Sequence, residues 1–318
     1  MKISILLLCL SFAATQITSA QTAISGTVKD DKGNPLHFVF VGDDQYKNAV
    51  FSDSFGNFSI TVHPDSKLKF EMKGYEDMVI DASKNSNNFQ IAMRPTGHGN
   101  SAAVLSTQSQ GDTVLQRPND VDFMRLPGHQ KGQLHGNRYL YTNFAHGFVI
   151  TASDVIFHHP DYVFDYDKLE GKLLYTSDMA TVNEVSWDQT KSFTFYNSND
   201  ERVDFEKVPA IDNSHFVQVV ASGGKYKIYK LIKTKFVKAD YVNNGMAAHG
   251  NDYDEYIDDA DYYFFDVQAN QLKKMSPKKK AIKEAFAKEA DKVNKFLSDN
   301  SGDINDAYLS KLGDYMNQ

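Results

Sequence analysis

The chain has 318 residues, with 34 Lys and Arg against 41 Asp and Glu, which gives a formal net charge of −7. This acidic balance disfavours nucleic-acid binding, because contact with phosphate groups needs a basic face. Aromatic residues make up 13% of the chain and only 8 prolines occur, a composition typical of a β-rich globular protein. The length accommodates two domains of ~150 residues.

The N-terminus has the pattern of a secretory signal peptide. Lys2 precedes the short apolar run Ile3–Phe12, and small residues precede Gln21. We expect cleavage after residue 20, so that residues 1–20 are removed and the protein is periplasmic or secreted. The only cysteine, Cys9, lies inside this segment behind a bulky leucine, so lipidation is not expected. No later apolar run reaches the ~20 residues that a transmembrane helix needs.

A stretch near the start of the mature chain has the pattern of a β-hairpin. Asp53 and Gly56 are turn residues, and apolar side chains alternate after them. The alternating residues are Phe58, Ile60 and Val62. This pattern predicts a half-buried strand that follows a tight turn.

With its surroundings, this hairpin resembles the carboxypeptidase-regulatory-like domain, a transthyretin-like sandwich. The resemblance rests on residues that occur in the family's order: Ile24, Gly26, Val28, Asp30, Gly33-Asn34-Pro35-Leu36, Val39, Val41, Asp53, Gly56, Phe58, Leu68, Phe70 and Gly74-Tyr75. It implies a seven-stranded β-sandwich over residues 21–95. The family is a non-catalytic accessory module, so the resemblance implies a fold and an origin in the envelope of a Bacteroidota-type bacterium, but no activity.

The next segment, residues 96–137, is rich in Gly, Ser, Gln, Asn, Asp and His and is interpreted as a linker, because it cannot bury enough apolar surface to fold. Within it, Val121–Leu126 is an apolar island that could dock on the next domain as an added strand or clasp. Residues 138–275 contain short alternating runs, which predict an antiparallel meander forming a curved sheet or partial barrel. The predicted strands are Tyr139–Thr151, Lys172–Thr176, Val182–Val185, Phe193–Tyr196, Val203–Val208, Phe216–Val220, Tyr226–Lys233, Phe236–Tyr241, Asp261–Val267 and Gln271–Met275.

The tail, residues 276–318, is predicted to form two helices that pack on the second domain. Ser276 and Pro277 have the pattern of an N-cap followed by a proline at the first helical position. Asp303 is expected to cap the second helix. The apolar residues at helical spacing are Ile282, Phe286, Ala290, Val293 and Leu297 in the first helix, and Ile304, Tyr308, Leu312 and Tyr315 or Met316 in the second.

The segment Asn251–Asp261 holds six carboxylates and is predicted to be a loop. Clustered oxygens favour a hard cation, so Asp252, Asp254 and Asp258 are candidate metal ligands, although the spacing is not that of an EF-hand. Two alternatives remain open. The loop can be solvated and paired with nearby lysines, which are Lys273, Lys274, Lys278, Lys279, Lys280 and Lys283, or it can contact a partner.

The second metal candidate is the pair His158 and His159, followed by Pro160 and Asp161. Neighbouring residues of a strand point to opposite faces, so both imidazoles reach one metal only where the chain turns. The alternative is a solvated loop. His146 is expected to be a core histidine.

The sequence contains no nucleophile elbow, phosphate-binding loop or spaced His-Glu motif, so no catalytic residue and no cofactor is assigned. The expected function is that of a non-catalytic cell-envelope protein contacting an envelope protein or a glycan. One alternative is a carrier of an apolar small molecule, held in the curved sheet. A second is a hydrolase with dispersed catalytic residues.

Overall fold

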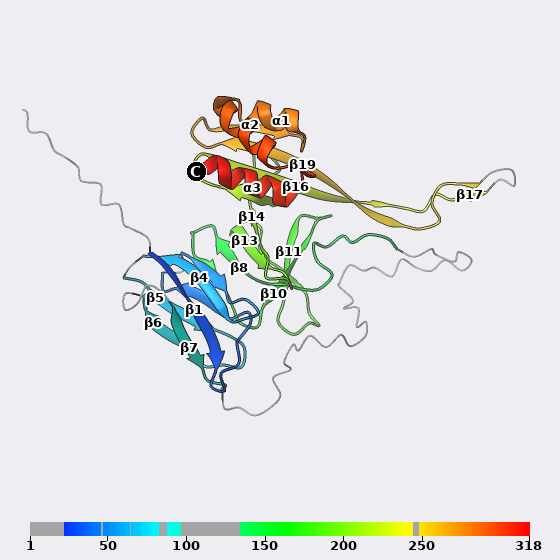
Figure 1. Cartoon of the computed structure of the whole chain (residues 1–318). Coiled ribbons are helices and arrows are strands. Elements are labelled where there is room, and N and C mark those ends of the chain that lie inside the picture. The colour runs from blue at the N-terminus through cyan, green and yellow to red at the C-terminus, as the bar shows by residue number, and fades with distance from the viewer. Residues whose placement is uncertain (1–21, 46, 64, 83–87, 97–133, 244–247) are drawn as a thin grey trace, which may run out of the picture.

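The computed structural model describes residues 22–45, 47–63, 65–82, 88–96, 134–243 and 248–318. The expected signal peptide lies outside these residues, as does most of the expected linker with its apolar island. The described chain is mostly β, and its helices follow the last strand near the C-terminus (Figure 1). This confirms the expected fold class.

The N-terminal part folds as seven strands in two sheets, in the orders β4-β1-β7 and β3-β2-β5-β6. Strand β1 pairs antiparallel with β4 and parallel with β7. The alternation predicted in β4 is confirmed, because every second residue of that strand is buried. The strands are β1 Thr22–Asp30, β2 Phe40–Asp43, β3 Ala49–Phe51, β4 Asn57–Val62, β5 Lys67–Glu71, β6 Met78–Asp81 and β7 Phe89–Met93.

The predicted turn before β4 forms for identifiable reasons. The Asp53 carboxylate accepts hydrogen bonds from the backbone N–H groups of Phe55 (2.9 Å) and Asn57 (2.7 Å). Gly56 has a φ of +79°, and a Cβ there would lie 2.4 Å from the carbonyl oxygen of Val28. The turn therefore needs an acceptor at its start and a glycine at its end.

The rest of the chain builds an eight-stranded sheet in the order β20-β19-β16-β15-β14-β13-β8-β9, beside the smaller sheet β10-β11-β12. All of its strand pairs are antiparallel, as predicted. Strands β9 and β10 were not predicted, and the two predicted strands Tyr226–Lys233 and Phe236–Tyr241 are wrong as separate elements, because β16 runs unbroken over Tyr226–Val237. The strands are β8 His146–Thr151, β9 Ile156–Phe157, β10 Val163–Asp167, β11 Lys172–Thr176, β12 Asn183–Glu184, β13 Thr190–Tyr196, β14 Arg202–Glu206, β15 Val217–Ser222, β16 Tyr226–Val237, β17 Val242–Asn243, β18 Ala248–His249, β19 Glu255–Asp266 and β20 Gln271–Met275.

Strands β16 and β19 form a long hairpin that projects from the body, with β17 near its far end (Figure 1). We call residues 234–243 and 248–258 the arm. The strands pair continuously from Tyr226 and Asp266 to Val237 and Glu255. The prediction of a loop over Asn251–Asp261 is therefore wrong from Glu255 onward, because these carboxylates lie on a strand.

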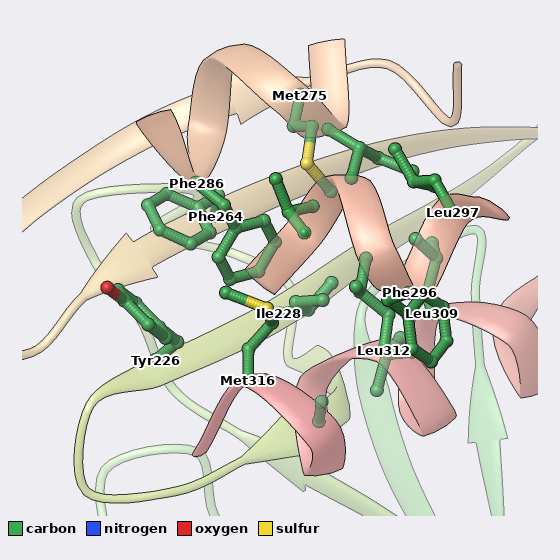
Figure 2. Packing of buried hydrophobic residues seen from close by; sticks show 14 residues of the cluster. Tyr226, Ile228, Phe264, Met275, Phe286, Phe296, Leu297, Leu309, Leu312 and Met316 are labelled. Carbon is green, nitrogen blue, oxygen red and sulfur yellow. The ribbon is translucent and has the colours of Figure 1, made fainter. Parts of the chain in front are cut away.

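Three α-helices cover one face of the large sheet where β15, β16 and β20 lie (Figures 1 and 2). They are α1 Lys279–Ala285, α2 Ala290–Asp299 and α3 Asp306–Asn317, with the 3₁₀ helix η2 Ala287–Glu289 between the first two. Of the residues predicted to face inward in the first helix, Ile282, Phe286, Val293 and Leu297 are buried, whereas Ala290 is exposed. None of the helices in the described part of the chain has the length and apolar character needed to cross a membrane.

The predicted N-caps of both helices are wrong, and the first predicted helix is not continuous. The first predicted helix is broken at Phe286, whose φ of −97° and ψ of 28° leave the α-helical region. Its N-cap is Lys278 rather than Ser276, and no side chain caps it. Asn305 rather than Asp303 caps α3, because its side chain accepts from the backbone N–H of Tyr308 at 3.0 Å.

The sandwich packs directly on β8 and β9 of the large sheet, a contact that the sequence analysis did not predict. A buried aromatic cluster bridges the two parts. From the sandwich come Phe40, Ala49 and Phe51, and from the large sheet come Phe148, Ile156 and Tyr196. At the rim, His37 contacts Asp200 at 2.5 Å and Lys73 contacts Asp161 at 3.0 Å. We call this contact the sandwich interface.

Candidate functional site

A surface cleft of about 220 Å³ lies beside the β10-β11-β12 sheet. It forms where the β10–β11 turn, the segment after β12 and the segment before β15 meet. Its floor is apolar and its rim is polar. The floor residues are Leu173, Val185, Trp187 and Phe216, and the rim residues include Glu170, Lys172, Glu184, Asn213 and Ser214.

The Trp187 side chain is contacted by Phe216 and by Lys207. Phe216 is buried and meets the half-buried Trp187 edge to face, with ring centroids 4.5 Å apart. The ammonium group of Lys207 lies 4.4 Å from the centroid of the Trp187 ring and also donates a hydrogen bond to the Trp187 carbonyl. Burial lowers the pKa of Lys207. These contacts fix the indole before any ligand arrives.

The rim carries two carboxylates held by cations. Lys172 Nζ lies 3.0 Å from a Glu170 oxygen and 3.2 Å from a Glu184 oxygen. Arg138 also donates to Glu170, at 2.9 Å. Hydrogen bonds from Lys172 and Arg138 lower the pKa of Glu170. Both cations are engaged, whereas the ionised oxygens have lone pairs left to accept hydrogen bonds.

Beside the cleft, a serine, a histidine and an aspartate are in mutual contact, but their wiring is not that of a nucleophilic triad. Ser214 Oγ lies 3.0 Å and Asp212 Oδ1 lies 3.1 Å from the same His215 nitrogen, Nδ1. A triad needs the nucleophile and the carboxylate on different ring nitrogens.

Asp212 instead organises a turn. Its Oδ1 accepts from the backbone N–H groups of Ser214 and His215, both at 2.8 Å, and its Oδ2 lies 2.5 Å from Lys233 Nζ. Burial tends to raise the pKa of Asp212, but the hydrogen bonds from Lys233 and Ser214 outweigh it and lower the pKa. The cluster therefore resembles an Asx-type turn more than a catalytic site.

The structure separates the two histidines predicted as a metal pair. His158 points into the sandwich interface, where it stacks on Phe40 with centroids 3.9 Å apart. His159 points outward and stacks on Tyr162 at 4.6 Å. His146 also lies at the sandwich interface, where it stacks on Phe38 at 4.2 Å rather than lying in the core of one domain.

The three aspartates of the other metal prediction have different surroundings and do not share a partner. Asp258 accepts hydrogen bonds from Lys168 Nζ (2.6 Å) and from the Thr234 hydroxyl (2.5 Å). Asp254 accepts from the backbone N–H of Ala239 at 2.9 Å, and Asp252 is exposed. Within the described residues, no group of three His, Cys, Asp or Glu side chains is arranged to hold a metal ion.

Part of the predicted lysine pairing is present, since Lys274 contacts Asp261 at 2.7 Å. This pair links β19 to β20, and the pair of Asp258 with Lys168 links β19 to the turn between β10 and β11.

None of the cleft residues was predicted from the sequence as a site residue. The one available signal was Trp187, the only tryptophan of the chain, close to Glu184. Their relation to Asn213 and Phe216 depends on the pairing of distant segments. No family model matches the chain, and no curated protein matches it either.

Proposed function

We propose that the chain is a non-catalytic binding protein of the bacterial cell envelope, and that its cleft takes a neutral saccharide. The observation that carries this proposal is an indole that lies in one small cleft with two carboxylates, those of Glu170 and Glu184. The indole is in contact with Phe216 and Lys207, and both carboxylates contact Lys172. A sugar ring offers an apolar C–H face to an aromatic ring and hydroxyl donors to carboxylate oxygens. The two parts of the cleft match these two parts of a sugar.

The size and charge of the cleft narrow the ligand class. Its volume of about 220 Å³ is below the ~300–1,000 Å³ of pockets that enclose drug-sized ligands. It therefore suits one ring-sized group at the end of a longer chain. Lys172 and Arg138 are already engaged by Glu170, so the rim favours a hydroxyl donor over an anion.

The proposed location in the cell envelope rests on the predicted export signal and on the resemblance of the N-terminal part to the carboxypeptidase-regulatory-like domain. Two observations support that resemblance. Seven strands form two sheets, and the turn residues Asp53 and Gly56 have the local roles that such a turn requires. An accessory module of this kind beside a binding surface fits an envelope protein better than it fits an enzyme.

The alternatives have less support. The covered face of the large sheet is filled by side chains from α1, α2 and α3, which leaves the cleft as the better place for a ligand than a carrier cavity in the sheet (Figure 2). The Asp212-Ser214-His215 contact does not favour a hydrolase. A protein partner is the second candidate function, because the arm exposes the apolar side chains Val237, Tyr241 and Val242.

Fluorescence tests the saccharide proposal directly, because Trp187 is the only tryptophan. The protein is titrated with a panel of neutral and acidic mono- and oligosaccharides. We expect a saturable change of emission with at least one neutral saccharide. Glu184→Gln should weaken that binding by ~tenfold or more, since a hydrogen bond to a charged group contributes about 1.5–3 kcal/mol.

The arm supplies the matched control. Tyr241 is exposed on the arm, away from the cleft, so Tyr241→Ser should bind like the unchanged protein. Binding that calorimetry still detects at full strength in Trp187→Leu would contradict the proposed site. A panel in which no neutral saccharide binds would contradict the proposed ligand class.

A further inference from the structure

Two imidazoles of the large sheet are enclosed by phenyl rings of the sandwich. His146 in β8 stacks on Phe38 with centroids 4.2 Å apart, and His158 just after β9 stacks on Phe40 at 3.9 Å. Phe51 adds ring contacts to both, at 5.9 Å and 5.5 Å. Both nitrogens of His158 are shut off from water. The sandwich thus covers two titratable rings with apolar surface.

We propose that the sandwich interface is an acid-sensitive latch, in which protonation of His146 and His158 separates the sandwich from the large sheet. The rings stack face to face on phenyl groups while they are neutral. An imidazolium in the same place would be a charge removed from water, which is costly unless an opposite charge pairs with it.

The charged groups around these rings do not supply such a partner. His146 faces His37, and His158 faces His146, His159 and Lys69, none of which is an anion. Lys69 is itself held by Glu71 at 2.5 Å and by Asp77 at 3.3 Å.

The other charged groups of the contact lie on its rim and have partners of their own. Arg202 lies 5.9 Å from the Phe148 centroid and pairs with Asp204 at 3.0 Å. The carboxylates Asp200 and Asp161 are held by His37 and Lys73. Acidification therefore adds positive charge to the interior of the contact, where these carboxylates do not reach.

The surroundings of both imidazoles lower their pKa values, which favours the neutral form in the closed interface. Burial, followed by the charge of His37, lowers the pKa of His146 to about 4. Burial lowers the pKa of His158 to about 3, although the Gly147 backbone partly offsets the effect. Both imidazoles are thus neutral in the closed form under conditions in which a solvated histidine is half charged.

The sign of the pH dependence follows from these directions. A histidine whose pKa falls on closing stabilises the closed form fully above its open-state pKa of 6.5, and this stability is lost as the pH falls from there toward the closed-state value. At pH ~5 each histidine then shifts the equilibrium toward separation by roughly thirtyfold. The rim pair His37–Asp200 opposes this, but it is partly exposed and screened.

Energy transfer between two dyes tests the latch in the full chain. Exposed Lys32 of the sandwich and Ser301 near α3 are changed to cysteine for labelling, with Cys9→Ser as background. The unchanged interface should hold the transfer efficiency constant from pH ~7.5 to ~6.5 and lose it reversibly between ~6 and ~4.5. Far-UV circular dichroism should stay constant over that range.

Two variants decide the cause. His146→Phe with His158→Phe keeps the ring stacking but cannot be protonated, so the efficiency should stay constant throughout. His159→Phe changes an exposed neighbour and should follow the unchanged interface. The proposal would be overturned if the double variant lost as much transfer efficiency as the protein with both histidines, or if that protein lost none down to pH ~4.5. A loss of circular dichroism in parallel with the transfer efficiency would also overturn it.

Should the double variant fail to fold, imidazole ¹³C resonances of the dye-labelled protein, with both histidines in place, provide the readout. His146 and His158 should become protonated only as the dyes separate. Protonation of both rings while the transfer efficiency remains high would overturn the latch.

Discussion

The large sheet is covered twice, once by the helices and once by the sandwich, and the two contacts differ in what they bury. Under the helices, the core consists of aliphatic and aromatic side chains, with Ile228, Phe264, Phe286 and Leu312 among them (Figure 2). Under the sandwich, the aromatic cluster includes two imidazoles. Both contacts exclude water, but only the second should respond to pH near neutrality.

The polar groups of the helix contact lie at its edge, and none of them is a histidine. The Tyr226 hydroxyl donates to Glu289 at 2.8 Å, and burial and this carboxylate raise the pKa of Tyr226 to about 12. Asp306 at the start of α3 accepts from Lys230 at 2.6 Å and from the Tyr262 hydroxyl at 2.7 Å. The helix contact should therefore supply stability and the sandwich interface a switch.

Removing the tail after Met275 should have the largest effect. It deletes the buried side chains Ile282, Phe286, Val293 and Leu297, each of which contributes about 1.5–3 kcal/mol by burial. Their sum compares with a total domain stability of ~5–15 kcal/mol. We expect the second domain to unfold or aggregate, while the sandwich keeps its β-type circular dichroism.

A point variant provides the control for this truncation. Phe286→Ala in the full chain should lower the free energy of unfolding by about 3–5 kcal/mol, equally at pH ~7.5 and ~5.5. A truncated chain that melts like the full chain would mean that the helices do not support the sheet.

A glycine in α3 allows the next test, because the helix lies very close to β15. A Cβ added at Gly313 would lie 2.2 Å from the Ala221 Cβ. Alanine favours a helix over glycine by ~1 kcal/mol, but overpacking costs about 1–3 kcal/mol, so Gly313→Ala should be destabilising. Ala221→Gly added to it should restore most of the loss in denaturant unfolding. Strict additivity of the two substitutions would contradict this close approach.

The rim of the sandwich interface should show the smallest effect. Asp200→Asn removes an ion pair with His37 that is partly exposed, and it keeps a residue type that tolerates the φ of 62° at this position. We expect a loss below ~1 kcal/mol at pH ~7. Burial tends to raise the pKa of Asp200, but hydrogen bonds from His37 and Ser54 lower it below the unfolded-state value of 3.8. The stability that the Asp200 carboxylate contributes is therefore present above pH 3.8 and is lost in stronger acid.

The matched control for this rim variant is Asp31→Asn, at an exposed carboxylate of the sandwich, which should change nothing measurable. A loss of several kcal/mol in Asp200→Asn would show that the rim, rather than the rings, holds the interface.

The predictions from sequence succeeded where neighbours in the chain decide the structure. The turn at Asp53 and Gly56 and the alternation in β4 depend on local geometry, so they were predictable. Strand β10 was missed because Asp165 and Asp167 interrupt its apolar pattern. Asp167 is buried only because Arg138, from another segment, pairs with it.

Neither the cleft nor the sandwich interface could be predicted from the sequence, and the physical reason is the same for both. His158 looks like a loop histidine until Phe40, from the other part of the chain, covers it. Trp187 becomes a site residue only when β11 and the segment before β15 bring Glu170 and Asn213 beside it. Such sites depend on long-range packing, which alternation and spacing do not encode.

Native-state hydrogen exchange by mass spectrometry at pH ~7.5 and ~5.0, corrected for intrinsic rates, tests the difference between the two contacts most directly. The account predicts that acid lowers protection of the amides in β2, β3 and β8. Protection of β16 and α3 should stay within about twofold, because their contact buries no group that titrates in this range. Equal losses of protection in both regions, or a loss confined to β16 and α3, would contradict it.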